Sequence, residues 1–482
     1  MSQITESVKQ KLRSIVVDGA SAYGYRISKI DDVYREIARC NLIADPFKRA
    51  DETRAVVERY PENPMIHLVY ATALLRIGDI RVHEAFATYN VKRKKFMSDT
   101  GLDSADTEIV NCSIVCGSFG NHYALAGLVE ANELGLREKK KLFLFKRQSQ
   151  NFTNPTLFEY FSPYINIIEC ENVNQSTYLF NNVLEIPIGA CLPLSTECLF
   201  LDFVRNKIEQ KKSENSSKSL FSLKSRHRAR GEKTLREIGL PKDAWFVTLH
   251  VREPTFRGET YSRTNDMFRS GDIQQYLPAC KEITKLGGWV FRVGDKSMKK
   301  LPSIPNVIDY AHSRYKSDWM DIYLAAASRF CIGTASGYFR VSQMFGVPII
   351  LTNSTQTIPL FSLTKNDIFL PRVISEASSG IPLSFSDVFV PPINMYAFDK
   401  LFKKKGYVWS ENTEDEITEA VKQMCRNLSL QPSLQINDQD MSRTVLKAVS
   451  TKTSEIIGTK LDISCQLSEH FIEKHARLMK SF

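Results

Sequence analysis

The sequence predicts an α/β protein in which a helical N-terminal region is followed by two series of alternating strands and helices. From residue 108 onwards, short apolar runs alternate with stretches of helical period, and glycine or polar turns separate them. This alternation is typical of parallel sheets covered by helices. The length agrees, because 482 residues exceed what one hydrophobic core usually holds, and about two to four domains are expected.

Residues 1–107 are expected to be helical. The clearest part runs from Tyr60 to Tyr89, with the sequence YPENPMIHLVYATALLRIGDIRVHEAFATY. Apolar residues recur there at helical spacing, and Gly78 separates two helices. The order of its proline, tyrosine, glycine and alanine residues resembles one tetratricopeptide-type (TPR-like) helix pair, without a good second copy. We expect a helical cap or a region that docks a protein partner.

The first strand–helix series covers residues 108–235. The predicted strands are EIVNCSIVCG, KKKLFLFK and YINIIEC, and the turn SFGNH precedes a helix in YALAGLVEANELGL. The stretch from Lys211 to Lys233 is serine-rich, basic and without clear periodicity. It therefore predicts a domain junction or a long surface loop. Its positive charge also fits a peripheral contact with a membrane.

The second series covers residues 236–400. The predicted strands are WFVTLHV, GWVFRVGD, NVIDYA, RFCIGTAS and VPIILTN, and the predicted helices are DIQQYLPACKEITKLG, SDWMDIYLAAAS and GYFRVSQMFG. Ser317 and Asp318 are expected to cap the second of these helices. Residues 401–482 are expected to be mainly helical, and one helix is expected to follow Ser410 with an acidic first turn.

Composition and charge narrow the classes of function. A net charge of +10 fits an anionic ligand or a membrane surface, but it is lower than we expect for a nucleic-acid-binding protein of this length. The ten cysteines are scattered without a CxxC motif, which predicts buried thiols in a reducing compartment. Because no long apolar segment occurs, we expect a cytoplasmic protein that is at most peripheral to the inner face of the membrane.

Polar residues recur where strands of the second series end. They form HVRE at 250–253, RVGD at 292–295, GTASG at 333–337 and LTN at 351–353. Ligands of open α/β sheets bind at the carboxyl ends of the strands, because loops and helix N-termini converge there. The binding residues expected from these stretches and the adjoining loop are His250, Arg252, Arg269, Asp295, Thr334, Ser336 and Gly337.

Two of these stretches favour a phosphate ligand. The small residues of GTASG allow close approach of the backbone, and the next helix offers N–H groups and the positive end of its dipole. His250 and Arg252 alternate along a strand, so their side chains share a face, and the guanidinium fork suits diphosphate oxygens. The alternatives are an ordinary turn for GTASG and a hydrogen-bonded core histidine for His250. Arg257 and Arg263 add positive charge to the following loop.

The sequence contains no P-loop, HExxH motif, nucleophile elbow or GxGxxG after a strand. Its DxD sequence, Asp438 to Asp440, lies in a polar C-terminal stretch away from both series. Anion-binding strand ends without a metal motif predict a diphosphate that is neutralised by arginine and helix dipoles. We therefore expect neither a metal nor another cofactor.

The segment from Phe246 to Asn353 resembles the signature region of a bacterial family of glycosyltransferases associated with surface polysaccharide synthesis. The matching stretches are LHVRE, FRSGDIQQYLPACKEITKLGGWVFRVGDKSMKKLP, NVIDYAHS, KSDWMDIYL, IGTASG and FGVPIILTN. More distantly, it is similar to the fucosyltransferase superfamily, whose GT-B fold has two Rossmann-like domains facing each other. The Glu253-Pro254 pair departs from that superfamily's first motif. The resemblance therefore does not identify the sugar donor.

The resemblance implies a role for several residues. His250 and Arg252 would contact the donor diphosphate, Asp321 would recognise the nucleotide base, and Thr334 and Ser336 would bind phosphate. It also implies a GT-B fold, with the donor on residues 236–400 and the acceptor against residues 108–235.

These expectations combine into a metal-independent glycosyltransferase. It would transfer a sugar from a nucleotide-diphosphate sugar to a glycan, lipid-linked or protein acceptor. Arg252 would neutralise the leaving diphosphate, and His122 or Glu253 would act as general base. A nucleotide-sugar epimerase or hydrolase on the same fold, and a non-catalytic helical-repeat scaffold, are the alternatives.

Overall fold

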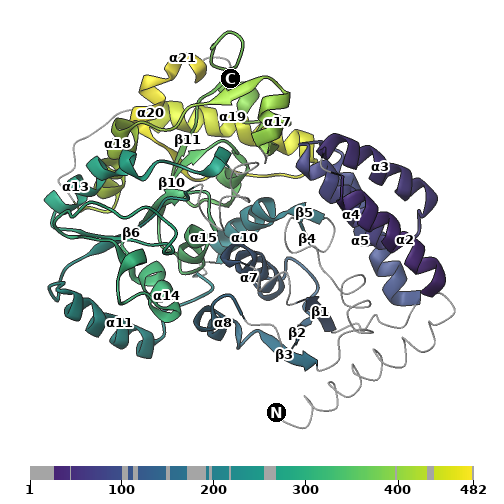
Figure 1. Ribbon diagram of the computed structural model, residues 1–482, viewed down its shortest axis with the longest axis horizontal. Helices are drawn as coiled ribbons and strands as arrows, with labels where there is room; N and C mark the ends of the chain where they lie inside the picture. The colour runs from purple at the N-terminus through teal and green to yellow at the C-terminus, as the bar shows by residue number, and fades with distance from the viewer. Residues whose placement is uncertain are drawn as a thin grey trace. The chain divides into compact units, whose positions relative to one another are not determined.

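Parallel strands alternate with helices in both parts of the chain (Figure 1). The structure, a computed structural model, describes residues 27–43, 45–99, 107–111, 118–147, 152–170, 191–194, 198–215, 219–253, 267–396, 399–430 and 439–479. The chain divides into two compact units, Met1–Val204 and Arg205–Phe482. The domain borders predicted after residues 107, 235 and 400 stay predictions.

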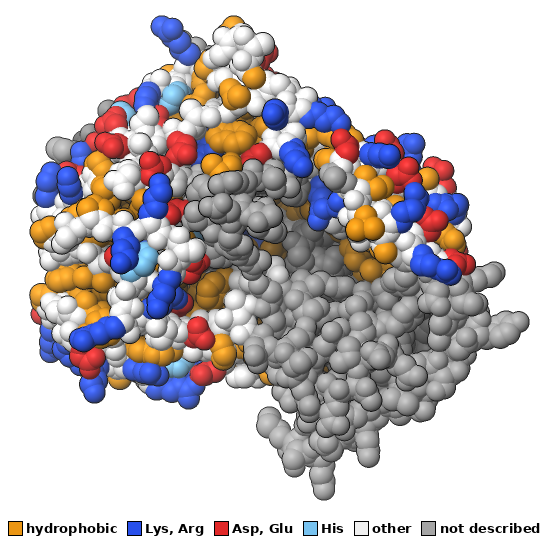
Figure 2. Space-filling view, in the orientation of Figure 1, with side chains coloured by type: hydrophobic (Ala, Val, Ile, Leu, Met, Phe, Trp, Pro, Cys, Tyr) orange, Lys and Arg blue, Asp and Glu red, His pale blue; other side chains and the backbone are white. Residues whose placement is uncertain are grey.

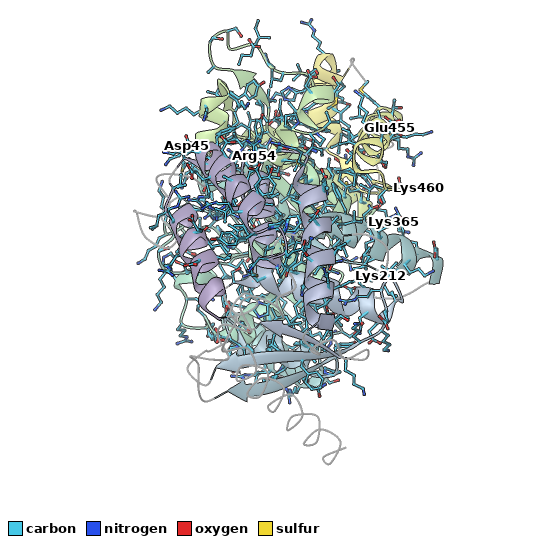
Figure 3. The ribbon with its side chains drawn as sticks, turned by 90° about the vertical axis from the view of Figure 1, so that its right-hand side faces the viewer. Asp45, Arg54, Lys212, Lys365, Glu455 and Lys460 are labelled. Atoms are coloured by element: carbon cyan, nitrogen blue, oxygen red, sulfur yellow. The ribbon has the colours of Figure 1, made fainter. Side chains whose placement is uncertain are left out.

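In the described part of the first unit, the helices between residues 27 and 99 lie side by side (Figure 3). They are α2 (Ile27–Asn41), α3 (Pro46–Arg59), α4 (Pro64–Arg76) and α5 (Val82–Asp99). Asp45 caps α3 by accepting hydrogen bonds from the N–H groups of Phe47 and Lys48, and Asn63 caps α4. The two helices predicted between residues 60 and 89 are confirmed as α4 and α5. Their identification as a tetratricopeptide-type pair stays a prediction.

A three-stranded parallel sheet follows in the first unit. It has the order β1 (Thr107–Asn111), β2 (Lys141–Arg147), β3 (Ile165–Cys170), with α7 (Phe119–Glu133) and α8 (Pro155–Phe161) in the connections. Two short antiparallel strands follow, β4 (Cys191–Pro193) and β5 (Cys198–Phe200). All three predicted strands are present, and the part of the first at 112–117 lies outside the described residues.

The described part of the stretch from Lys211 to Lys233 is mostly helical, so the prediction of a long surface loop was wrong. The alternative prediction, a domain junction, stays a prediction. Helix α10 (Leu201–Asn215) runs into this stretch, and α11 (Ser225–Ile238) occupies most of the rest. The buried face of α11 consists of His227, Gly231, Thr234 and Leu235. A Cβ on Gly231 would lie 2.2 Å from the ring of Tyr323. The hydrophobic pattern missed this helix because small and polar residues form most of its buried face.

The second unit is built on a seven-stranded sheet in which every pairing is parallel. Its strands are β6 (Phe246–His250), β7 (Trp289–Arg292), β8 (Val307–Ile308), β9 (Cys331–Thr334), β10 (Ile349–Ser354), β11 (Ile368–Pro371) and β14 (Gln466–Leu467). The strand order is β14-β11-β10-β9-β6-β7-β8. Strands β7 and β8 therefore lie on one side of β6, and the later strands β9, β10, β11 and β14 lie on its other side. This is the Rossmann strand order with one added strand, and the order reverses between β6 and β9.

The connections of this sheet are mainly helical. They are η1 (Met267–Arg269), η2 (Ile273–Tyr276), α13 (Leu277–Lys285), η3 (Tyr310–His312), α14 (Asp318–Ala327), α15 (Gly337–Met344) and η4 (Ile358–Ser362). Helix α14 begins after Ser317 as predicted, but the Ser317 side chain makes no capping bond, and its hydroxyl donates to the carbonyl of Tyr315 instead. The predicted side-chain cap was therefore wrong.

The remaining elements follow β11. They are β12 (Ile374–Glu376), α16 (Phe385–Val388), η5 (Ile393–Met395), α17 (Asp399–Lys404), β13 (Tyr407–Trp409), α18 (Glu414–Asn427), α19 (Gln439–Ile457), α20 (Glu469–Lys474) and α21 (Ala476–Met479). Strands β12 and β13 form a small antiparallel sheet. The predicted helix after Ser410 is α18, where Thr413 and Glu416 form a reciprocal capping box. None of the described helices is long and apolar enough to cross a membrane.

Strands β6 and β9 leave no room for a side chain at Gly333. A Cβ on Gly333 would lie 2.2 Å from the carbonyl oxygen of His250, which belongs to the backbone of the neighbouring strand. Backbone cannot move aside as a side chain can. Only glycine therefore fits this position without separating the two strands.

We predict that Gly333→Ala lowers the free energy of unfolding by about 3 kcal/mol, because the added methyl group forces β6 and β9 apart. The matched control is Gly380→Ala. Gly380 has a φ of +71° but nothing within 4 Å of an added Cβ, so only the backbone strain of about 1 kcal/mol applies. Urea unfolding of the second unit measures both. Equal midpoints for the two variants would show that the strands are not so close.

Candidate functional site

The candidate site lies at the carboxyl ends of β6 and β9, where the strand order reverses. The backbone N–H of Arg252, just after β6, donates a hydrogen bond of 2.9 Å to the hydroxyl of Thr334 at the end of β9. Both residues are buried. The structure therefore brings together two stretches predicted to bind the same ligand, HVRE and GTASG. The Thr334 hydroxyl joins the two stretches by accepting this hydrogen bond.

His250 is the last residue of β6 and stacks on the ring of Tyr338, with centroids 5.6 Å apart and planes inclined by 10°. Burial, helped by the nearby charge of Arg292, lowers its pKa to about 4. The imidazole is therefore neutral at pH 7. Among the described residues its Nδ1 has no hydrogen-bond partner although it is buried. A buried polar atom of this kind is costly unless a ligand or water bonds to it.

Ser336 and Gly337 form the start of α15. Ser336 is the N-cap residue, but its side chain makes no capping bond, and within the described part of the chain its buried Oγ has no partner. The first N–H groups of an α-helix have no acceptor within the helix, and its dipole favours negative charge there. Helix N-termini of this kind often bind anions, and the phosphate-binding role of Ser336 and Gly337 stays a prediction.

Glu253 belongs to a buried network around Arg292. Its Oε1 accepts a 2.8 Å hydrogen bond from Arg292 Nη2, and its Oε2 accepts one of 2.8 Å from the N–H of Lys299. Arg292 is completely buried and also bonds to Asp309 at 3.0 Å. These contacts hold the backbone next to Arg252 in place. Both carboxylate oxygens are occupied, and the general-base role of Glu253 stays a prediction.

Asp295 and Asp321 lie in other groups of contacts. Asp295 Oδ1 accepts from the N–H of Ser297 and closes the turn after β7. Asp321, in the first turn of α14, accepts a 2.9 Å bond from the Tyr310 hydroxyl and pairs with Lys316. Burial raises the pKa of Asp321. Both residues keep the predicted binding roles as predictions only.

His122 lies in the first unit, on α7, and its side chain is completely buried. Its Nδ1 bonds to the carbonyl of Ser118 at 3.0 Å, and the rings of Phe119, Phe158 and Phe161 surround it. Burial lowers its pKa to about 4. A general base must reach the acceptor hydroxyl, and this packing does not expose the imidazole. Its catalytic role stays a prediction.

A further buried arginine, Arg372, follows β11 and was not predicted from the sequence. Its Nε donates to the side-chain oxygen of Asn353 at 3.3 Å, and its Nη2 donates to the carbonyl of Ser270. Asn353 is also bonded to the Tyr276 hydroxyl at 2.9 Å and to the N–H of Asn412 at 2.8 Å. Desolvation lowers the pKa of Arg372 to about 10, so it is charged at pH 7. The sequence contains one sign of this residue's role, because Arg372 directly follows the apolar run IFLP, as Arg252 follows an apolar strand.

The segment Met267–Gly271 crosses the ends of these strands and carries Arg269, which is partly buried. The N–H of Gly271 donates to the Arg252 carbonyl at 3.0 Å. At its other end, the N–H groups of Met267 and Phe268 both donate to the carboxylate of Asp399 at 2.7 Å. The preceding loop at 254–266, with Arg257 and Arg263, lies outside the described residues.

Within the described ranges, no group of three or more histidine, cysteine, aspartate or glutamate side chains is arranged to hold a metal ion. The expectation that no metal or other cofactor is needed stays a prediction.

Comparisons with known proteins give weak similarities. No family model matches the chain, and no curated protein sequence matches it either. Three similar solved structures are a glycosyl transferase family 9 protein from Veillonella parvula, the iron-containing dodecameric glycosyltransferase TibC from enterotoxigenic E. coli, and the E. coli ADP-heptose lps heptosyltransferase II.

Their sequence identities are 10%, 12% and 10%, and their TM-scores are 0.40, 0.33 and 0.30. The alignments cover 66%, 67% and 51% of this chain and 97%, 77% and 84% of the other chains, in the same order. Similarity at this level supports no argument about the chemistry of this chain. The strand order and the contacts described above carry the argument instead.

We predict that Arg292→Met destabilises the protein by about 3–5 kcal/mol, because it leaves Glu253 and Asp309 without their buried partner. Lys285→Met is the control, since Lys285 is 69% exposed and pairs with Glu282 on the surface, where such pairs contribute little. Urea unfolding followed by circular dichroism compares them. A midpoint for Arg292→Met that equals the control's would rule out this network.

We predict that stability falls as the pH drops from 6.5 towards 4. His83, His122 and His250 each have a pKa lowered from 6.5 to about 4 by burial, so in this range the unfolded chain binds protons that the folded chain does not. Above pH 6.5 these histidines are neutral in both the folded and the unfolded chain, so they no longer lower the free energy of unfolding. The variant His122→Phe removes one of these protons and should reduce the slope of unfolding free energy against pH by up to about 1.4 kcal/mol per unit. Urea titrations across this pH range measure the slope, and an unchanged slope would contradict the prediction.

Proposed function

We propose that the protein is a glycosyltransferase of the GT-B type, which binds the diphosphate of a nucleotide-sugar donor at the carboxyl ends of β6 and β9. The observation that carries the proposal is the reversal of strand order in the seven-stranded sheet. It places His250, Arg252 and Ser336 at one edge, where doubly wound sheets bind their ligands. The resemblance of Phe246–Asn353 to bacterial glycosyltransferases supports the same chemistry.

Each residue at this edge has a proposed role. The Arg252 guanidinium neutralises charge on the diphosphate, while Ser336 Oγ and the N–H groups of α15 bind its oxygens. Neutral His250 offers a hydrogen bond from Nδ1, the atom without a partner in the described structure. Arg269 adds positive charge from the segment above. On the resemblance alone, Asp321 is assigned to the nucleotide base, and there it would exchange its contact with Lys316 for one with the base.

The reaction transfers a glycosyl group. The oxygen of an acceptor hydroxyl forms a bond to the anomeric carbon, the bond from that carbon to the diphosphate breaks, and the diphosphate leaves with the bonding electron pair. Charge grows on the leaving oxygens, and donors held in position by the fold stabilise it without reorganising. The proton of the acceptor goes to a general base. Glu253 or His122 would serve only after leaving its present contacts.

The proposal extends to the setting of the reaction. The acceptor is a glycan, a lipid-linked sugar or a protein, and no metal takes part. The protein acts in the cytoplasm or at the inner face of the membrane, in surface polysaccharide or glycoconjugate synthesis. Helices α2–α5 offer a surface for a protein partner.

We predict that nucleoside diphosphates or their sugars raise the melting temperature of the full chain. A screen of GDP-, UDP-, ADP- and dTDP-sugars tests this, with a CMP-sugar as the matched ligand that has only one phosphate. Arg252→Ala should weaken binding of the best ligand about 10- to 100-fold, since it loses charge-assisted hydrogen bonds. Lys285→Met removes a surface charge and should bind normally. If no ligand raises the melting temperature, or if Arg252→Ala binds as tightly as the parent, the donor site is elsewhere.

We also predict that turnover of the preferred donor requires an acceptor. Release of nucleoside diphosphate is measured with and without an extract that contains lipid-linked glycans. Equal turnover without any acceptor would identify a nucleotide-sugar epimerase or hydrolase instead. A chain that binds no donor, but whose cellular role depends on residues 1–105, would be the helical-repeat scaffold.

A further inference from the structure

A second surface of the second unit combines clustered lysines with exposed apolar side chains. It consists of Lys400, Lys403, Lys404 and Lys405 on and just after α17, with Ile381 and Val408 from the adjoining β12–β13 sheet; we name these residues the α17 patch. All six are exposed, Ile381 by 63% and Val408 by 47%. Around the place of α17 in Figure 1, Figure 2 shows lysine and arginine side chains next to hydrophobic ones.

The fold fixes the lysines on the outside. Leu401 and Phe402 are buried, and the Phe402 ring packs against Trp409 with centroids 5.2 Å apart. With this face of α17 anchored, the lysines on either side of it extend into solvent. Gly406, with a φ of +73°, then turns the chain directly into β13. The lysines are therefore held together by a rigid turn.

The apolar residues lie near the end of the small sheet where this turn is. The N–H of Ala377 donates to the carbonyl of Gly406 at 2.7 Å, and the N–H of Glu376 donates to the carbonyl of Ile381 at 3.0 Å. Ile381 is bonded to Glu376, and the next residue along the chain, Ala377, is bonded to Gly406 in the turn after Lys405. Ile381 is thus one residue pair away from that turn. Val408 pairs with Ser375 and lies one residue pair further from the turn.

Acidic groups also lie near the lysines. Glu376 is the exposed carboxylate on the sheet itself, and it accepts a 2.9 Å hydrogen bond from Ser379. The carboxylate of Asp399, at the start of α17, accepts the two N–H groups of Met267 and Phe268. The patch thus places four exposed lysines beside an exposed isoleucine.

We propose that the α17 patch binds the surface of an anionic lipid bilayer, with the lysines on the headgroups and Ile381 inserted among the acyl chains. Lysines attract anionic lipid, and an apolar side chain beside them gains free energy only from a partner with an apolar interior. A soluble polyanion would use the lysines alone. The combination therefore favours a membrane over a nucleic acid or an acidic glycan.

The basic helix α11 fits this role less well. Its exposed side carries Arg226, Arg228, Arg230, Lys233 and Arg236, but Glu232 and Glu237 lie among them. The large hydrophobic side chains exposed in the described structure include none from α11. The membrane contact predicted from residues 211–233 is therefore reassigned to α17.

The α17 patch is connected to the strand ends. Asp399 begins α17 and, through its bonds to Met267 and Phe268, holds the segment that carries Arg269 across β6 and β9. A bilayer on the patch would lie close to this edge, where a lipid-linked acceptor could approach the donor. That consequence rests on the proposed function, whereas the lipid binding itself does not.

Co-sedimentation of the full chain with vesicles tests the proposal. Vesicles of phosphatidylcholine with phosphatidylglycerol are compared with vesicles of phosphatidylcholine alone, and binding is expected only to the former and to weaken with salt. The triple variant Lys403→Gln/Lys404→Gln/Lys405→Gln should lower the partition coefficient about 100-fold. Ile381→Ser should lower it about 10-fold. The matched control Arg226→Gln/Arg228→Gln/Lys233→Gln, on α11, should bind like the parent.

Several outcomes would overturn the proposal. They are no binding to anionic vesicles, equal binding by the α17 triple variant, or loss of binding in the α11 control instead. If Ile381→Ser has no effect and dextran sulfate binds as tightly as vesicles, the partner is a soluble polyanion. Melting curves of each variant identify any loss of folding. Nucleotide binding by the same samples separates this result from the proposed function, because a chain that binds vesicles but no nucleotide would refute only the latter.

Discussion

The pairing of β6 with β9 is the constraint on which the rest of the candidate site depends. The sheet can reverse its strand order only where two strands that are distant in the sequence lie side by side, and here Gly333 allows contact with the His250 carbonyl. The bond from the Arg252 N–H to Thr334 continues this pairing beyond the last ladder residue. As a result, an arginine from one strand and the start of α15 from the other reach the same edge.

Two completely buried arginines support this edge from either side. Arg292 connects Glu253, just after β6, with Asp309, just after β8. Arg372 connects Asn353, in β10, with the carbonyl of Ser270. A buried guanidinium is tolerated only where several acceptors surround it, so each arginine determines the positions of the loops it touches. The loops that surround the proposed diphosphate site are held by these networks and by backbone hydrogen bonds.

Asp399 connects the site with the α17 patch. Asp399 uses its carboxylate on two backbone N–H groups of the segment Met267–Gly271, while the lysines of the same helix face solvent. One short helix thus holds the segment that crosses the strand ends and presents a basic surface. If lipid binds that surface, this carboxylate is one route by which the site could respond.

The sequence by itself determined the alternation of strands and helices, because burial on both faces of a parallel strand requires continuous apolar runs such as WFVTL and VPIIL. It also determined that HVRE and GTASG stand at strand ends, since charged or small residues directly after such runs are visible without a structure. The helix α11 was missed because its buried face is mostly glycine, threonine and histidine, with Leu235 as its large hydrophobic residue.

Only the tertiary structure decided which of these residues meet. Thr334 and Arg252 are 82 positions apart, and strand order, which no local pattern encodes, brings them together. It also showed Glu253 bonded to Arg292, His122 enclosed by phenyl rings, and Arg372 bonded to Asn353. Each of these contacts joins residues from different elements, so the packing of those elements determines them.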